Sequence, residues 1–202
     1  MSEMAGIAAT IFRKAGRRER FMVGVAGPPA SGKSTMAERL AGLFPQGSAV
    51  VVGMDGFHYD DAVLDRRGLS ARKGAPETFD YAGFEHLLRR IRAREADIAI
   101  PIFDRARELS RAAAAIVAAD VKFILVEGNY LLLDEPPWTG LSGLLDFSVF
   151  IDTPRDELER RLVERWAGHG RSEAAARAWI ESNDMPNIDR VRAKRREADL
   201  VL

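Results

Sequence analysis

An eight-residue segment near the start of the chain has the composition and spacing of a phosphate-binding loop. Residues 27–34 read GPPASGKS and match the pattern G-x-x-x-x-G-K-[ST]. An apolar run at 21–26 precedes this segment and a helical pattern at 33–43 continues from it, which is the context that the motif requires. Backbone N–H groups of such a loop, together with the helix N-terminus, hold nucleotide phosphates. The motif therefore predicts a nucleotide-binding protein.

The residue types in the loop suit this role individually. Gly27 and Gly32 let the backbone turn and approach the phosphates closely. Lys33 is expected to reach the β- and γ-phosphates, and the Ser34 hydroxyl is expected to ligate Mg²⁺. ATP and Mg²⁺ are therefore the predicted cofactors. The residues predicted to bind the nucleotide in this segment are Gly27, Pro28, Pro29, Ala30, Ser31, Gly32, Lys33, Ser34 and Thr35.

Two carboxylates follow predicted buried strands, where open α/β sheets bind their ligands. Glu127 closes the run KFILVE and so has the Walker B position, an acid at the C-terminal end of an apolar strand. Asp55 follows the run AVVVGM and could accept the proton of an acceptor hydroxyl during in-line attack on a γ-phosphate. Ser34, Asp55 and Glu127 are the predicted metal ligands. A helix cap or a solvated strand end is the alternative role for either acid.

The surrounding pattern alternates short apolar runs with helical segments, which predicts a doubly wound α/β sheet. The runs lack polar alternation, as do strands that are buried on both faces of a parallel sheet. The predicted strands are 21–26, 49–54, 122–127, 147–152 and 198–202, and the predicted helices are 33–43, 83–94, 155–167, 172–181 and 189–197, with a short amphipathic helix within 1–18. The alanine-rich run 112–117 favours a helix by propensity, although a hairpin strand is also open there.

Composition narrows the class of protein. The chain has 202 residues, 30 Lys+Arg against 30 Asp+Glu, and no cysteine. The absence of cysteine excludes a disulfide scaffold, a thiolate zinc site and a cysteine nucleophile. Zero net charge argues against a non-specific nucleic-acid binder, and no apolar run reaches the length of a membrane span. We expect no signal peptide, and a single cytoplasmic domain over residues 1–202.

From about residue 20 to its end, the chain resembles P-loop kinases of the uridine kinase, phosphoribulokinase and pantothenate kinase group. The segments that carry the resemblance, besides the loop, are MDGFHY (54–59), KGAPETFDY (73–81), IPIFDRAR (100–107), VEGNYLLL (126–133), RRLVER (160–165) and READLVL (196–202). Within this group, EGNYLLLDEPPW (127–138) and SNDMPN (182–187) are most similar to bacterial kinases named for fructose transport.

The resemblance implies a three-layer P-loop kinase fold. It implies a five-stranded parallel sheet in the order 2-3-1-4-5, an inserted β-hairpin at about 98–118 and a helical lid at about 155–175. The alanine-rich run then becomes the second strand of the hairpin, because tertiary context can override local propensity. The adenine is expected against 183–192. The resemblance leaves a homodimer open.

The resemblance also implies roles for individual residues. Asp55 would be the catalytic base, acting with Lys33 and lying close to Glu127. The lid arginines Arg160, Arg161, Arg165 and Arg171 would fold over the nucleotide. On a helix Arg161 and Arg165 share a face, so we expect these two to contact phosphates together. A solvated charged helix face is the alternative, since glutamates alternate with these arginines.

The expected activity is ATP- and Mg²⁺-dependent transfer of a γ-phosphate to a hydroxyl of a small metabolite. A fructose-like sugar or a nucleoside is the first expectation, and a pantothenate-like alcohol or a regulatory nucleotide switch is the alternative. Uridine kinases keep a histidine in the hairpin where FDRARELSR (103–111) has none, which argues against uridine. The predicted acceptor contacts are His58, Tyr59, Arg105, Asn129 and Tyr130, each of which could instead make a local structural hydrogen bond.

Overall fold

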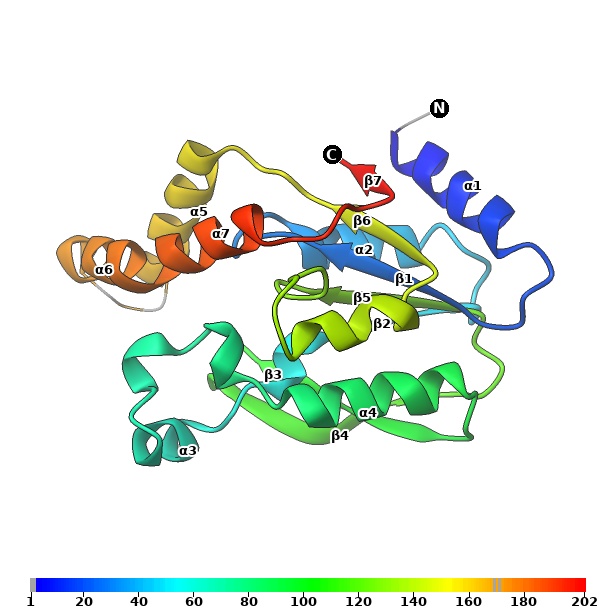
Figure 1. Cartoon of the computed structure of the whole chain (residues 1–202), viewed down its shortest axis with the longest axis horizontal. Helices are drawn as coiled ribbons and strands as arrows, with labels where there is room; N and C mark the ends of the chain where they lie inside the picture. Colours follow the sequence, from blue (N-terminus) through cyan, green and yellow to red (C-terminus); the bar gives the residue numbers. More distant parts are fainter. Residues whose placement is uncertain (1–2, 169, 171) are drawn as a thin grey trace.

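The computed structural model describes residues 3–168, 170 and 172–202. In this part of the chain a five-stranded parallel sheet forms the centre (Figure 1). Its strands are β1 (Phe21–Ala26), β2 (Ala49–Gly53), β5 (Phe123–Gly128), β6 (Phe147–Phe150) and β7 (Leu200–Val201). They lie in the order β2-β5-β1-β6-β7, which is the predicted order 2-3-1-4-5 when only these strands are numbered. The predicted fold class is confirmed.

Helices connect the strands close to where the sequence places them. The α-helices are α1 (Glu3–Ala15), α2 (Lys33–Ala41), α3 (Asp61–Arg66), α4 (Tyr81–Arg92), α5 (Arg155–Gly168), α6 (Glu173–Trp179) and α7 (Met185–Ala193). Short 3-10 turns occur at η1 (Met54–Phe57), η2 (Ser70–Arg72), η3 (Pro76–Thr78) and η4 (Trp138–Leu144). The predicted helix 189–197 is shifted, because a π-helical turn, η5 (Ile180–Asp184), joins α6 directly to α7.

Side chains that alternate along the sheet strands enter two cores on opposite faces. On β1, Met22 belongs to a cluster that includes Phe84 and Leu88 of α4. The next residue, Val23, belongs to a second cluster with Ile11 of α1 and Leu40 of α2. Strand residues of period two therefore bury both faces of the sheet, as the continuous apolar runs predict.

The inserted hairpin is present. Its strands β3 (Ile98–Asp104) and β4 (Leu109–Val117) pair antiparallel, with Ile98 opposite Val117. The alanine-rich run therefore lies in a strand, although its alanines favour a helix. Ile98, Ile100 and Val117 are at most 2% exposed within the α4-side core. Burying these side chains decides the structure of the hairpin against local propensity.

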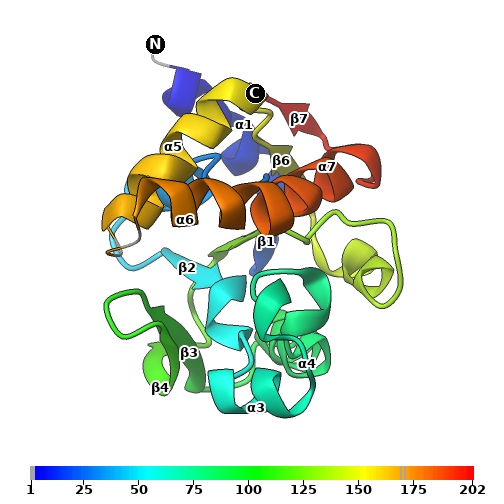
Figure 2. The ribbon, with the colours of Figure 1, turned by 90° about the vertical axis from the view of Figure 1, so that its left-hand side faces the viewer.

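Helices α5, α6 and α7 form a separate layer at one end of the sheet. Helix α5, the turn η5 and helix α7 share a small apolar cluster that contains Leu158, Leu162, Ile180, Met185 and Ile188. Because η5 continues α6 into α7, the two helices run as one rod across the view in Figure 2, with α3 and the β3–β4 hairpin below it. Among the described residues, no helix is long and apolar enough to cross a membrane.

Candidate active site

The predicted phosphate-binding loop lies between β1 and α2 and is tightly curled. A Cβ added to Gly27 would lie 2.5 Å from the Ser31 hydroxyl oxygen and 3.1 Å from the Ile151 carbonyl oxygen. Gly32 has a φ of +92° and directly precedes α2. Glycine is therefore required at both positions, for close approach at one and for a left-handed backbone at the other. The N-terminal N–H groups of α2 then follow the loop, as an anion site requires.

Two buried charges of opposite sign flank the end of the loop. Lys33 is 7% exposed and Glu127 is 6% exposed. The Ser34 hydroxyl donates a hydrogen bond to Glu127 Oε2 at 3.1 Å. Burial lowers the pKa of Lys33, although the carboxylates of Glu127 and Asp55 oppose this shift. Burial raises the pKa of Glu127, and the Lys33 ammonium opposes that shift.

Asp55 lies in η1, immediately after β2. The pairing of β2 with β5 sets Gly53 opposite Glu127, which brings both acids to the same edge of the sheet. Arg105, on the hairpin, places Nη2 2.7 Å from Asp55 Oδ2. Burial alone would raise the pKa of Asp55, but the charges of His58, Lys33 and Arg105 outweigh it and hold this pKa below its ordinary value. The Asp55 carboxylate is therefore ionised at neutral pH and can accept a proton.

His58 supports Asp55 through the backbone. Its Nδ1 lies 2.9 Å from the Asp55 carbonyl oxygen, and its ring packs between Phe79 and Phe103 at centroid distances of 4.0 and 4.9 Å. Burial lowers the pKa of His58, although the Asp55 carboxylate opposes this shift. The buried ring therefore helps to fix the backbone that carries the Asp55 carboxylate.

A cavity of about 660 Å³ opens beside these groups. It lies between the phosphate-binding loop, the segment after β2, the hairpin and the α5–α7 layer. The predicted site residues that line it are Pro29, Lys33, Asp55, His58, Arg105, Asn129 and Arg165. Side chains from five separated stretches of sequence therefore meet in one space, which has the size of a small-molecule site.

Other predicted residues lie outside the lining. Tyr130 is fully buried and donates a hydrogen bond to the Gly74 carbonyl oxygen at 2.6 Å. The ring of Tyr59 packs under the guanidinium of Arg67 at 4.4 Å. Neither tyrosine is among the described residues that line the cavity, so their contact with an acceptor stays a prediction.

The predicted lid arginines differ from one another in their contacts. Arg165 lines the cavity, and burial lowers its pKa. Arg161 donates to the Ala30 carbonyl oxygen at 3.1 Å and so ties α5 to the phosphate-binding loop. Arg160 pairs with glutamates of its own helix, 2.7 Å from Glu157 and 2.5 Å from Glu164. Arg171 lies outside the described residues.

Several further residues line the cavity. Asp184 and Asn187 lie within 183–192, where the adenine is expected, and Lys73 and Phe103 are candidates for the acceptor side. The lining residues that no prediction covered are Asp61, Asp65, Ser70, Gly74, Ala106, Glu108, Trp166 and Trp179. The rings of Trp166 and Trp179 meet edge to face at 5.9 Å, and the Trp166 indole N–H donates to Asp184 at 2.7 Å. Trp166, Trp179 and Asp184 lie in α5, α6 and η5, respectively. No spacing in the sequence predicts that these three side chains meet.

The donor atoms near Lys33 fit a magnesium ion. The Ser34 hydroxyl, Asp55 and Glu127 offer oxygen ligands, which Mg²⁺ prefers together with phosphates and water. Burial disfavours the negative charge of Glu127, as its raised pKa indicates, and a nearby cation would stabilise that charge. Within the described part of the chain, no group of three or more His, Cys, Asp or Glu residues forms a metal cluster by itself.

The fold and this site define a P-loop kinase. Residues 22–202 match the model of the "Phosphoribulokinase / Uridine kinase family", and the chain belongs to that family. It is therefore an ATP-dependent kinase that acts on a hydroxyl group of a small molecule.

Relatives with this architecture cover nearly the whole chain. A crystal structure from Silicibacter sp. TM1040, a "putative fructose transport system kinase", is 41% identical and superposes over all of both chains with a TM-score of 0.94. The uncharacterized protein YggC of Escherichia coli is 38% identical over 92% of this chain and 78% of its own length. "Putative uridine kinase C227.14" of Schizosaccharomyces pombe is 32% identical over 92% of this chain and 83% of its own length.

Proposed function

We propose that this chain transfers the γ-phosphoryl group of ATP to a hydroxyl of an uncharged sugar or nucleoside, with Asp55 as the base. The observation that carries the proposal is the shared cavity. Lys33 of the phosphate-binding loop and Asp55 after β2 both line it. A phosphate donor on the loop and a hydroxyl beside Asp55 would therefore occupy the same cavity, and holding the two reactants together supplies much of the catalysis.

The reaction follows from these positions. The acceptor oxygen attacks the γ-phosphorus while the bond from the γ-phosphorus to the β–γ bridging oxygen breaks, and ADP leaves. The Asp55 carboxylate takes the proton of the hydroxyl. Lys33 and Arg165 offset negative charge on the phosphates. Ser34, Asp55 and Glu127 would hold Mg²⁺, which neutralises phosphate charge when bound.

The charges around Lys73 favour an uncharged acceptor. The Lys73 ammonium lies 2.7 Å from Asp61 Oδ1 and 3.7 Å from Glu108 Oε2. Arg105, another cation that lines the cavity, is bound to Asp55. An acceptor carboxylate or phosphate would have to compete with these carboxylates for either cation, whereas hydroxyl groups meet no such barrier.

Asn129 supports the same choice. Its Oδ1 is buried and has no hydrogen-bond partner among the described residues. Asn129 lines the cavity, so a ligand hydroxyl there could donate the missing hydrogen bond. A polyhydroxy compound suits this group better than a carboxylate, which cannot donate when it is ionised.

The experiment is a kinase assay with ATP and Mg²⁺ over matched acceptors. Each neutral sugar or nucleoside is compared with a phosphorylated or carboxylate-bearing counterpart, and pantothenate is included. We expect turnover of a neutral compound, and a loss of about 10²–10⁴ in kcat for Asp55→Asn. The variant should still bind a non-hydrolysable ATP analogue, which stabilises a protein by about 2.7 kcal/mol at 100 times its Kd.

Three results would overturn parts of this proposal. Full activity of Asp55→Asn would remove Asp55 as the base. A clear preference for anionic acceptors would remove the uncharged substrate class. Slow ATP hydrolysis with no phosphorylated acceptor in any reaction would favour a regulatory nucleotide switch in place of a small-molecule kinase.

A further inference from the structure

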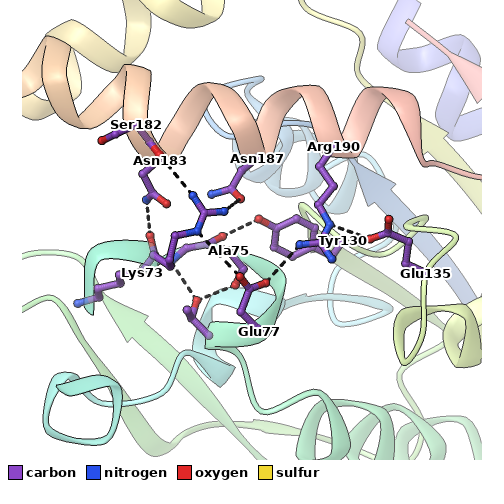
Figure 3. Close-up of polar contacts among 12 residues, drawn as sticks. Lys73, Ala75, Glu77, Tyr130, Glu135, Ser182, Asn183, Asn187 and Arg190 are labelled. Atoms are coloured by element: carbon purple, nitrogen blue, oxygen red, sulfur yellow. Dashed lines mark hydrogen bonds and ion pairs between the residues drawn. The ribbon is translucent and has the colours of Figure 1, made fainter. Parts of the chain in front are cut away.

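A group of polar contacts joins the segment 72–77 to the rod formed by η5 and α7 (Figure 3). We call this group of contacts the interlock. Asn183 Nδ2 donates to the Lys73 carbonyl oxygen at 2.8 Å. Arg72 directs Nη2 to Asn187 Oδ1 at 3.3 Å and Nη1 to the Ser182 carbonyl oxygen at 3.4 Å. The two segments that the interlock connects lie about 110 residues apart in sequence.

The interlock continues toward the core. Arg190 of α7 donates to Glu135 at 2.7 Å and to Glu77 at 3.3 Å. The buried Tyr130 hydroxyl donates to the Gly74 carbonyl oxygen. Figure 3 shows these side chains converging on the turn around Ala75 from both sides. The turn is therefore held between α7 and the segment that follows β5.

The buried amides of the interlock are costly for stability alone. Asn183 is fully buried and Asn187 is 1% exposed. Asn183 Oδ1 has no hydrogen-bond partner among the described residues. An apolar side chain would fill this space without a desolvation penalty, because a buried polar atom without a partner destabilises the folded state. The presence of a buried asparagine at this position therefore needs an explanation other than packing.

The bonded turn is also part of the cavity wall. Lys73, Gly74 and Asn187 all line the cavity. Gly68 and Gly74 have φ values of +66° and +96°. The three-residue turn η2 is the regular structure in the short stretch between these two glycines. Glycine raises the backbone entropy that this short stretch loses on ordering. Without the interlock, a ligand would have to order the turn when it binds.

We infer that Asn183 and Arg72 are positioning residues for the acceptor: they fix the Lys73–Gly74 turn against α7 so that this wall is formed before the acceptor binds. The inference rests on the proposed function. The turn carries the Lys73 ammonium that Asp61 and Glu108 hold, so its position also sets the charge pattern that the acceptor meets. Weakening the interlock should act on acceptor binding more than on ATP binding or on the chemical step.

The test uses two interlock variants and one matched control. Asn183→Asp keeps the shape of the side chain but removes the N–H that binds Lys73. Arg72→Lys keeps the charge but cannot donate to the Ser182 carbonyl oxygen and to Asn187 Oδ1 at the same time, as the two Nη groups of the guanidinium do. Arg89→Lys is the control, since Arg89 is exposed on α4 and pairs with Glu85 of the same helix. We expect the acceptor KM to rise about tenfold in both interlock variants, one buried hydrogen bond having roughly this effect. In Arg72→Lys, which lies outside the segment expected to contact adenine, ATP KM and kcat should stay within about threefold of the wild-type values.

Amide hydrogen exchange supplies a readout that needs no acceptor. Exchange at 72–75 should rise in the interlock variants and not in Arg89→Lys, while exchange in β1 stays unchanged. Equal increases in both KM values, or an unchanged acceptor KM with unchanged exchange, would overturn the inference. If the wild-type protein phosphorylates no acceptor, the proposed function fails, and exchange still decides whether Asn183 anchors the turn. Should Asn183→Asp not fold, Arg72→Lys answers the same question.

Discussion

The contact between η1 and the hairpin offers the sharpest test of how the fold positions Asp55. Gly56 follows Asp55 directly, and a Cβ added there would lie 2.6 Å from the Pro101 carbonyl oxygen and 2.9 Å from the Pro101 carbonyl carbon. Both are backbone atoms of β3. Real Cβ atoms do not approach closer than 3.0 Å, so Gly56→Ala forces η1 and β3 apart by at least about 0.4 Å.

The hairpin cannot yield easily, because neighbouring Ile98 and Ile100 are buried in the core. Overpacking of this kind costs about 1–3 kcal/mol in the free energy of unfolding. For a domain of this size each kcal/mol lowers Tm by about 2–4 °C, so we expect a loss of about 2–12 °C. The displacement also separates Asp55 from Arg105 across the same boundary. Misplacement approaching 1 Å can cost about 10²-fold, so we expect kcat/KM to fall by about 10- to 100-fold.

The assay pairs differential scanning calorimetry with steady-state kinetics on the acceptor that the wild-type protein phosphorylates. Gly6→Ala in α1 is the matched control, since a Cβ there meets nothing within 4 Å. That change should stabilise the protein by about 0.5–1 kcal/mol and leave activity intact. If Gly56→Ala kept wild-type Tm and wild-type kcat/KM, the rigid contact between η1 and β3 would not be what positions Asp55.

Two further predictions concern buried polar groups. Burial raises the pKa of Glu127 in the folded protein above its unfolded value, so the metal-free protein is most stable below that unfolded value. Its free energy of unfolding should then lose this contribution as pH rises through the raised pKa, and Glu127→Gln should remove that part of the slope in urea denaturation between about pH 4 and 8. Tyr130→Phe leaves the Gly74 carbonyl without its hydrogen bond, so we expect a loss of about 1–3 kcal/mol by urea denaturation, with kcat within about threefold of wild type. A large loss of kcat would instead support the predicted acceptor contact of Tyr130.

Local sequence patterns predicted much of the fold and the residues of the phosphate-binding part of the site. The strand runs, the GPPASGKS loop and the acids after two strands depend on neighbours within a few residues, so spacing alone predicts them. Asp55 and Glu127 could also be placed at one sheet edge, because parallel strands end together. Of the predicted acceptor contacts, His58, Arg105 and Asn129 line the cavity, whereas Tyr59 and Tyr130 lie outside its lining. No spacing in the sequence predicts that Trp166 lies in this lining.

The sequence by itself determined the phosphate-binding loop and its lysine, the alternation of strands and helices, and the acids that end the strands. Only the tertiary structure decided that the alanine-rich run forms a strand, since the run pairs with β3 and Val117 at its end is buried in the core. It also decided that Asn183 meets Lys73 across about 110 residues of sequence. A hydrogen bond of that kind depends on how layers pack, and packing is set by the whole chain rather than by the residues on either side.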